Sequence, residues 1–342
     1  MALNTFGLDL GSKHVRAVWL DSTGEHAFSL SSAFSAPMPE KGLQSESPLD
    51  QQQVAQVIGQ VVSEAHITVK SVNIALPENQ VYTRVVETPV LSDKELTSAI
   101  YWIAEQQIPI PLKSVTLDYR ILHKPTPEEK STTMQVLLVG APTALLDRYE
   151  HVLSLIGLSI ASVETDTLAA LRVLTKPDKI GRMVLNVGLA SSTLSLAVGN
   201  DLRVVYSIPT GTMALTRAIS TNLNMSLTQA EAYKNTYGVT PGHGNSLEVA
   251  VEPILNVMVS EVKKAISFFR EKLPDATLSE MLLIGDDAQV PGLAQYFQAR
   301  TGLTTHGADP WGMLGIKNLP KELVDEGPAY AVALGLAMRT YE

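Results

Sequence analysis

The chain of 342 residues contains no cysteine. This absence excludes disulfide bonds, thiol nucleophiles and zinc–thiolate sites, and it agrees with a reducing compartment such as the cytosol. A basic excess is also missing, because the formal net charge is -9 at pH 7, and this argues against binding to nucleic acid. The hydrophobic share of 45% and the charged share of 18% predict a globular protein, and the length of 342 residues predicts two domains or one bilobed unit.

Long apolar runs are absent as well. The most apolar segment, residues 152–163, is interrupted by serine and glycine and is shorter than the roughly 20 residues that cross a bilayer. The first residues carry no basic region and contain Asp9 within an apolar run, so they predict a strand rather than a signal peptide. We therefore expect any membrane association to depend on a partner protein.

Several signatures of catalysis are missing too. The sequence has no Gly-x-Ser-x-Gly elbow and no Walker loop that ends in Gly-Lys-Ser/Thr. Its seven histidines are scattered, and none stands four residues from another, so they do not indicate a metal site.

An internal repeat is present instead. Residues 6–18 (FGLDLGSKHVRAV) and 183–198 (MVLNVGLASSTLSLAV) both predict a strand, a glycine turn and a second strand. Asp9 and Gly11 in the first copy correspond to Asn186 and Gly188 in the second. The repeat predicts two α/β lobes that face one cleft.

Two such turns could hold a polyphosphate from both sides. Glycine allows the backbone N–H groups to approach an anion closely, and a carboxylate at each turn could hold Mg²⁺ directly or through water. Asp-x-Gly turns are also common in ordinary β proteins, so the residue types alone favour plain hairpins about equally.

Two further motifs can be explained by local structure without a ligand. The segment QAEAYK (229–234) places Glu231 and Lys234 on one helical face, where a solvated ion pair is the simpler interpretation. The segment IGDDAQVPGL (284–293) predicts a strand, a turn and a helix, with Asp286 and Asp287 in the turn. An exposed acidic turn before a helix would also explain it.

The middle of the chain predicts a separate α+β module. Residues 34–48 are rich in proline, serine and glycine and predict a loop that enters it. A helix is expected near residues 54–65, strands at 71–76, 81–87, 115–122 and 134–139, and a helix from a capping box formed by Ser92 and Glu95. Trp102 lies off the apolar stripe of that helix, so exposure for a partner and packing within the module are equally expected.

These motifs, in this order, resemble the actin-like ATPase superfamily. Residues 7–18 resemble its first phosphate motif and residues 186–196 its second. AEAYK matches the Ala-Glu-x-x-Lys signature that faces the ribose, IGDDAQVPGL stands at the adenosine motif, and AYAVALGLAMR resembles the closing helix.

Residues 74–122 narrow the resemblance to the PilM family of type IV pilus assembly, which is related to the division protein FtsA. Similar features are the Leu-Pro after a strand, SDKEL, and AEQQIPIPL followed by LDY. The resemblance implies an α/β fold with duplicated, ribonuclease H-like lobes at 1–33 and 161–342 and a small inserted α+β subdomain at 34–160. It also implies a cytoplasmic protein, at the inner membrane through its partners, that forms a ring and binds the N-terminal tail of the membrane protein PilN.

The same resemblance implies ATP and Mg²⁺ in the cleft, with Asp9 facing the metal. The partner-binding candidate on the module, Trp102, comes from the helical pattern instead. The implied nucleotide-binding residues are Asp9, Gly11, Ser12, Lys13, Asn186, Gly188, Ser191, Ser192, Thr193, Gly211, Glu231, Lys234, Gly285, Asp286 and Asp287.

Three residues depart from the family pattern. Asn186 stands where the second motif has aspartate, which removes a charge that would hold metal. Asp286 and Asp287 stand where the adenosine motif has glycine, and they are expected to bring negative charge toward the α-phosphate. We therefore predict a scaffold with a weakened or lost ATP site and without catalytic residues.

Two other functions remain open. An ATPase switch that controls pilus or type II secretion assembly is favoured by Asp9, Gly11, Gly188, Glu231 and Lys234. A sugar kinase on the same fold would need a catalytic base and a sugar pocket, and the sequence indicates neither. An Hsp70-like chaperone is less favoured, because no substrate-binding domain is recognised.

Overall fold

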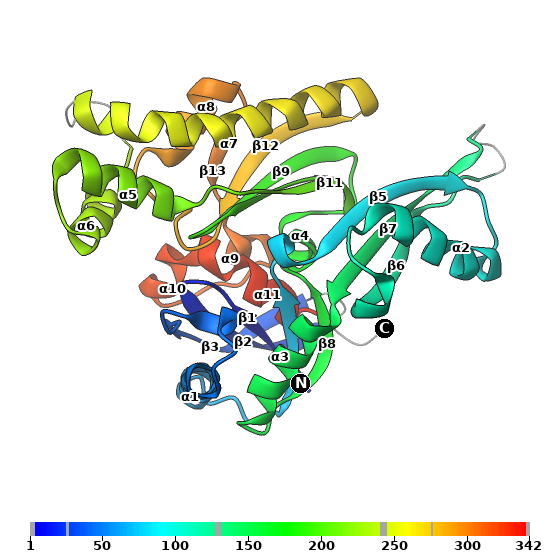
Figure 1. Ribbon diagram of the computed structural model, residues 1–342, viewed down its shortest axis with the longest axis horizontal. Coiled ribbons are helices and arrows are strands. Elements are labelled where there is room, and N and C mark those ends of the chain that lie inside the picture. Colours follow the sequence, from blue (N-terminus) through cyan, green and yellow to red (C-terminus); the bar gives the residue numbers. More distant parts are fainter. Residues whose placement is uncertain (1–3, 25–26, 127–130, 240–244, 275, 340–342) are drawn as a thin grey trace.

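The structure is a computed structural model, and it describes residues 4–24, 27–126, 131–239, 245–274 and 276–339. Figure 1 shows two stacked lobes and a smaller module to one side. The strands are β1 (Thr5–Leu10), β2 (His14–Gly24), β3 (Ala27–Pro37), β4 (Ser71–Leu76), β5 (Tyr82–Pro89), β6 (Val115–His123), β7 (Thr133–Pro142), β8 (Ser159–Thr165), β9 (Ile180–Val187), β10 (Ser192–Val198), β11 (Asp201–Ile208), β12 (Thr277–Ile284) and β13 (Thr305–Gly307).

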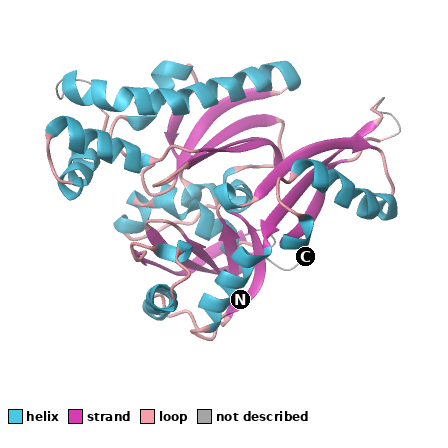
Figure 2. Ribbon diagram, viewed as in Figure 1, coloured by secondary structure: helices cyan, strands magenta, loops and turns pink. Residues whose placement is uncertain are grey.

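Helices cover the outer faces of the sheets and fill the space between the lobes (Figure 2). They are α1 (Pro48–Glu64), α2 (Asp93–Gln107), α3 (Thr143–Ser154), α4 (Asp166–Leu174), α5 (Thr212–Leu223), α6 (Leu227–Tyr237), α7 (Asn245–Lys272), α8 (Leu293–Thr301), α9 (Pro310–Met313), α10 (Lys321–Asp325) and α11 (Ala331–Ala337). Short 3₁₀ helices include η2 (Glu78–Gln80), η3 (Leu112–Ser114) and η4 (Gly327–Tyr330). Among the residues described, no helix is both long enough and apolar enough to span a bilayer.

The predicted repeat is present as two sheets of the same topology. The first sheet has the order β3-β2-β1-β4-β8 and the second β11-β10-β9-β12-β13. In each sheet the central strand, β1 or β9, pairs antiparallel with the following strand and parallel with a later one. The expected α/β fold with duplicated lobes is therefore confirmed.

The lobes meet along α4 and α11, which cross very closely. A Cβ atom on Gly335 would lie 1.8 Å from the carbonyl oxygen of Ala169, so only glycine allows this crossing. Small buried residues of both helices pack against β2 in the first sheet and against β9 and β12 in the second. This shared core holds the two halves of the cleft next to each other.

The module is smaller than the predicted range of 34–160. Strands β5, β7 and β6 form a separate sheet of three strands, and α2 packs on it around Leu96, Ile100 and Met134. The rest of the range belongs to the first lobe, because β4 pairs with β1 and because Ile58 and Tyr149 enter the core of that lobe. The prediction was too wide since parallel pairing between distant strands leaves no local mark in the sequence.

Helix α2 begins and ends as predicted. Ser92 and Glu95 form the full capping box, and the helix stops before the two prolines that follow it. Trp102 is 71% exposed and its neighbour Tyr101 is 60% exposed. Packing of Trp102 inside the module is therefore excluded, whereas its role in partner binding stays a prediction.

Three elements outside the module were not predicted. Residues 34–37, expected in a loop, belong to β3 and pair with β2. Strand β8 and helix α4 were also missed, and Asp166, which lies at their junction, lines the cleft.

Candidate functional site

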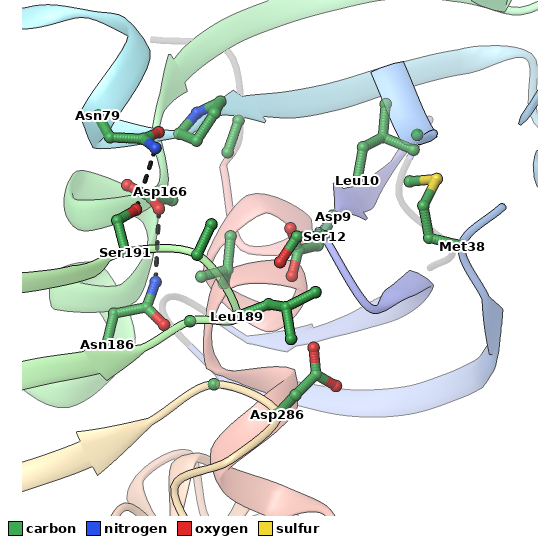
Figure 3. A pocket seen from close by; sticks show the side chains of 18 of the residues that line it. Asp9, Leu10, Ser12, Met38, Asn79, Asp166, Asn186, Leu189, Ser191 and Asp286 are labelled. Carbon is green, nitrogen blue, oxygen red and sulfur yellow. Dashed lines mark hydrogen bonds between the residues drawn. The ribbon is translucent and has the colours of Figure 1, made fainter. Parts of the chain in front are cut away.

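A cavity of about 320 Å³ lies between the lobes (Figure 3). The parallel strands β1, β4, β8, β9 and β12 all end at its wall, because the residues after their carboxyl ends line it. This is the edge at which open α/β sheets bind ligands. The volume is at the lower end of the range for small-molecule sites.

The two glycine turns face each other across this cavity. The β1–β2 turn contributes Gly11 and Ser12, and the β9–β10 turn contributes Gly188 and Ser191. A Cβ atom on Gly188 would lie 2.4 Å from the carbonyl oxygen of Ser191, so the tight turn requires glycine. The repeat in the sequence thus places its two turns on opposite sides of the cavity, as predicted for turns that hold a ligand from both sides.

Two carboxylates that sequence reasoning missed also line the cavity. Asp166 begins α4 directly after β8, and Glu78 begins η2 shortly after β4. The backbone N–H of Glu78 donates to Oδ1 of Asp166 across 3.2 Å. Each residue follows the carboxyl end of a parallel strand, which is the signal that could have revealed it.

Burial raises the pKa values of two carboxyl groups in the cavity, those of Asp9 and Asp166. Desolvation, with repulsion from Asp286, raises the pKa of Asp9 to about 7 although Arg16 lowers it. Desolvation, with repulsion from Glu78 and Asp9, raises the pKa of Asp166 to about 8. Near neutral pH these two groups therefore hold protons that exposed carboxylates would have released.

Asn186 lies next to Asp166. Its Nδ2 is 3.4 Å from Oδ2 of Asp166, and Figure 3 shows the two side chains pointing toward each other. An aspartate at this position would add one more negative charge to the group. On the same wall Asn79 donates to the hydroxyl of Ser191 across 3.0 Å and links the first lobe to the second.

These donors fit Mg²⁺ poorly. Among the residues that the structure describes, no three histidine or acidic side chains are grouped so that they could hold a metal ion. The raised pKa of Asp9 favours its protonated, uncharged form, and Asn186 supplies no charge. Asp9 could hold Mg²⁺ only after losing its proton.

An ion-pair network fills the other side of the cleft. Nζ of Lys13 is 2.7 Å from Oδ1 of Asp287 and 2.8 Å from Oε1 of Glu231. Lys234, which is 0% exposed, lies 2.9 Å from Glu231 and 3.2 Å from Asp287. Thr212 donates a short hydrogen bond to Asp287 as well.

The charges in this network are strongly stabilised. Burial alone would raise the pKa of Glu231, but hydrogen bonds from Lys13, Thr216 and Lys234 lower it to about 2. Burial alone would lower the pKa of Lys13, but Asp287 and Glu231 raise it above its ordinary value. The pair formed by Glu231 and Lys234 is thus part of a network between lobes, not the solvated helical pair considered from the sequence.

Asp286 makes a second ionic contact between the lobes. It accepts hydrogen bonds from Arg16, by a very short contact, and from Nδ1 of His14 at 2.7 Å. Burial would raise the pKa of Asp286, but His14 and Arg16 lower it to about 2. The guanidinium of Arg16 also lies 5.4 Å from the centre of the Tyr330 ring.

The candidate residues divide into two groups. Those that line the cavity are Asp9, Gly11, Ser12, Asn186, Gly188, Ser191, Thr193, Gly285 and Asp286. The others, which do not line it, are Lys13, Ser192, Gly211, Glu231, Lys234 and Asp287.

The expectation for Asp287 needs correction. It was predicted to bring charge toward a phosphate, but its side chain is 4% exposed and is bound by Lys13, Lys234 and Thr212. Asp286 does line the cavity, and its charge is balanced by Arg16.

Comparison with known proteins gives the family. The family model described as type IV pilus assembly protein PilM matches residues 7–341. The chain belongs to the PilM family. This PilM-family chain is also 24% identical over 378 residues to the cell division protein FtsA of Streptococcus pneumoniae serotype 2 (strain D39 / NCTC 7466), covering 97% of the chain and 79% of FtsA.

Solved structures agree with membership of the PilM family. A PilM–PilN type IV pilus biogenesis complex matches with a TM-score of 0.85 and 26% identity, covering 98% of both chains. The ethanolamine utilization protein EutJ from Carboxydothermus hydrogenoformans matches at a TM-score of 0.58 and 13% identity over 97% of this chain and 88% of its own. A MamK double helical filament matches at 0.55 and 12% over 97% of both. These two likenesses support the actin-like fold alone.

Proposed function

We propose that this protein is a cytoplasmic scaffold of a type IV pilus assembly platform that binds the N-terminal tail of a PilN-like membrane protein. The observation that carries this proposal is the match to the PilM–PilN complex over 98% of both chains, together with the family match over residues 7–341. The resemblance of residues 74–122, which include β5 and α2 of the module, supports it from the sequence.

We place the tail between the first lobe and the three-stranded module. The module is joined to the first lobe at both ends, through η2 before β5 and through α3 after β7. A tail that is disordered when free loses conformational entropy on binding, so its affinity should depend on a few apolar or arginine anchors.

Attachment to the membrane would then come from the partner. The net charge of -9 disfavours direct attraction to anionic lipid. The protein should therefore remain unbound when mixed with anionic vesicles and should float with vesicles that carry the tail of a PilN-like protein. Strong flotation without the tail would contradict the proposal and would indicate a lipid-binding surface.

We further propose that the nucleotide site is weak. Asn186 removes a metal-facing charge, Asp9 has a raised pKa, and the network around Lys13 and Asp287 fills part of the cleft. The expected result is no multi-turnover ATP hydrolysis and little rise in melting temperature with ATP and Mg²⁺. A ligand at 100 times its dissociation constant would add about 2.7 kcal/mol to the free energy of unfolding.

One observation favours a second candidate, an ATPase switch. Asp166 lines the cavity and its pKa is raised to about 8, which lies close enough to neutral pH for the side chain to exchange a proton there. Steady release of phosphate that disappears in both Asp9→Ala and Asp166→Asn would establish this switch and refute the weak site. A sugar kinase would require a general base together with a saturable sugar substrate.

A further inference from the structure

Each of the two aspartates that replace glycine makes a charged contact with the opposite lobe. Asp286 and Asp287 follow β12 in the second lobe. Their partners Lys13 and Arg16 lie in the β1–β2 turn and in β2 of the first lobe. These ion pairs therefore cross the cleft directly.

The charges in the second lobe explain why Lys13 is held in this contact. Within the second lobe, Glu231 and Asp287 share the ammonium group of Lys234, which leaves one surplus negative charge in this group. Lys13 neutralises it by binding both carboxylates at 2.7 and 2.8 Å. Because Asp287 and Lys234 are almost fully buried, water cannot take the place of Lys13 without rearrangement.

The contact at Asp286 repeats this arrangement. Its charged partners are Arg16, which is 4% exposed, and His14, and both come from the first lobe. Separating the lobes would either expose the buried Arg16 to water or leave it beside Tyr330 without its carboxylate partner. Removing one partner of such a pair is unfavourable, since the other charge stays buried.

We propose that Asp286 and Asp287 act as built-in anions that hold the two lobes together through Lys13 and Arg16 without a bound nucleotide. The two carboxylates occupy cations of the first lobe that a polyphosphate in the cleft could otherwise attract. The closed arrangement of the lobes, and with it the position of the module, is thereby independent of the nucleotide. This inference goes beyond the proposed partner and holds whichever tail the protein binds.

The distance between the lobes tests the inference directly. The chain has no cysteine, so Gln53→Cys on α1 and Ser260→Cys on α7 place two spin labels specifically, on exposed positions of the first and second lobe. Pulsed electron paramagnetic resonance of the full chain then gives the distribution of distances between the labels. The labelled protein should show one narrow distribution, unchanged by ATP and Mg²⁺.

Asp286→Asn combined with Asp287→Asn should shift the distribution to longer distances by more than its own width. Amide exchange in α11 should rise by about 10- to 100-fold, since a hydrogen bond to a charged group is worth about 1.5–3 kcal/mol. The matched control is Asp178→Asn, which removes a 2.9 Å pair with Arg182 inside the second lobe and should leave the distance unchanged.

Lys13→Met tests the same contact from the other lobe if the aspartate variants fold poorly. It keeps the aliphatic stem of a side chain that is 18% exposed, and it should open the lobes as well. Unchanged distances in the folded aspartate variant or in Lys13→Met would show that the other contacts between the lobes are sufficient to hold them, and would overturn the inference. A broad distribution that narrows only with ATP and Mg²⁺ would overturn it too. Flotation with the PilN-like tail is measured separately, so failure here is distinct from failure of the proposed function.

Discussion

Asp166→Asn should make the protein more stable at alkaline pH. The pKa of Asp166 is raised from 3.8 to about 8 by burial and by repulsion from Glu78 and Asp9. Between these two values the folded protein keeps the proton while the unfolded chain releases it. Stability is therefore fully present below about pH 4, falls as the pH rises toward about 8, and is level above that.

The magnitude follows from the size of the shift. Each pKa unit corresponds to about 1.4 kcal/mol, so a shift of this size sets an upper limit of about 6 kcal/mol. The cavity admits water to the side chain and Asp9 shares the repulsion, so we expect the asparagine variant to gain about 2–3 kcal/mol at about pH 9 and little at about pH 4.

Urea unfolding at several pH values measures this effect, with the midpoint compared at constant slope. The control is Asp147→Asn, since Asp147 is an exposed aspartate on α3. If the stability of Asp166→Asn and of the unmodified protein depended on pH in the same way, the claim that Asp166 is a protonated carboxylic acid in the cavity would be refuted.

Three further predictions concern other parts of the molecule. Gly335→Ala should lose about 2–4 kcal/mol in thermal unfolding, because the new methyl group would overlap α4, whereas Gly59→Ala, which has ordinary contacts on α1, should be neutral or slightly stabilising. Asn186→Asp adds a charge beside Asp166, so its melting temperature should fall in EDTA and recover with Mg²⁺; a fall that Mg²⁺ does not reverse would show that the cavity holds no cation. Trp102→Ala should change the free energy of unfolding by less than about 0.5 kcal/mol and weaken tail binding or self-association, and unchanged binding would remove Trp102 from the interface.

The features predicted well are those that depend on residues close together in the chain. The repeat of a strand, a glycine turn and a strand located both turns of the cleft, because each hairpin is formed by neighbouring residues. The capping box at Ser92 fixed the start of α2 in the same way. The resemblance of residues 74–122 identified the family.

The features predicted poorly depend on residues far apart in the chain. Strand β4 inserts beside β1, and this parallel pairing decided that much of the range 34–160 belongs to the first lobe. Asp166 was missed because β8 enters the sheet only through β4. The direction of Asp287 depends on Lys13, which is 274 residues away, so the sequence indicated an acidic turn but not its partner.

The most direct test of the account is the affinity for the partner tail with and without nucleotide. A fluorescent peptide with the N-terminal tail of a PilN-like protein would be titrated with the full chain, once in EDTA and once with ATP and Mg²⁺. The account predicts saturable binding at one peptide per chain with the same dissociation constant in both conditions. No binding would contradict the scaffold, and binding that requires ATP and Mg²⁺ would contradict its independence of the nucleotide.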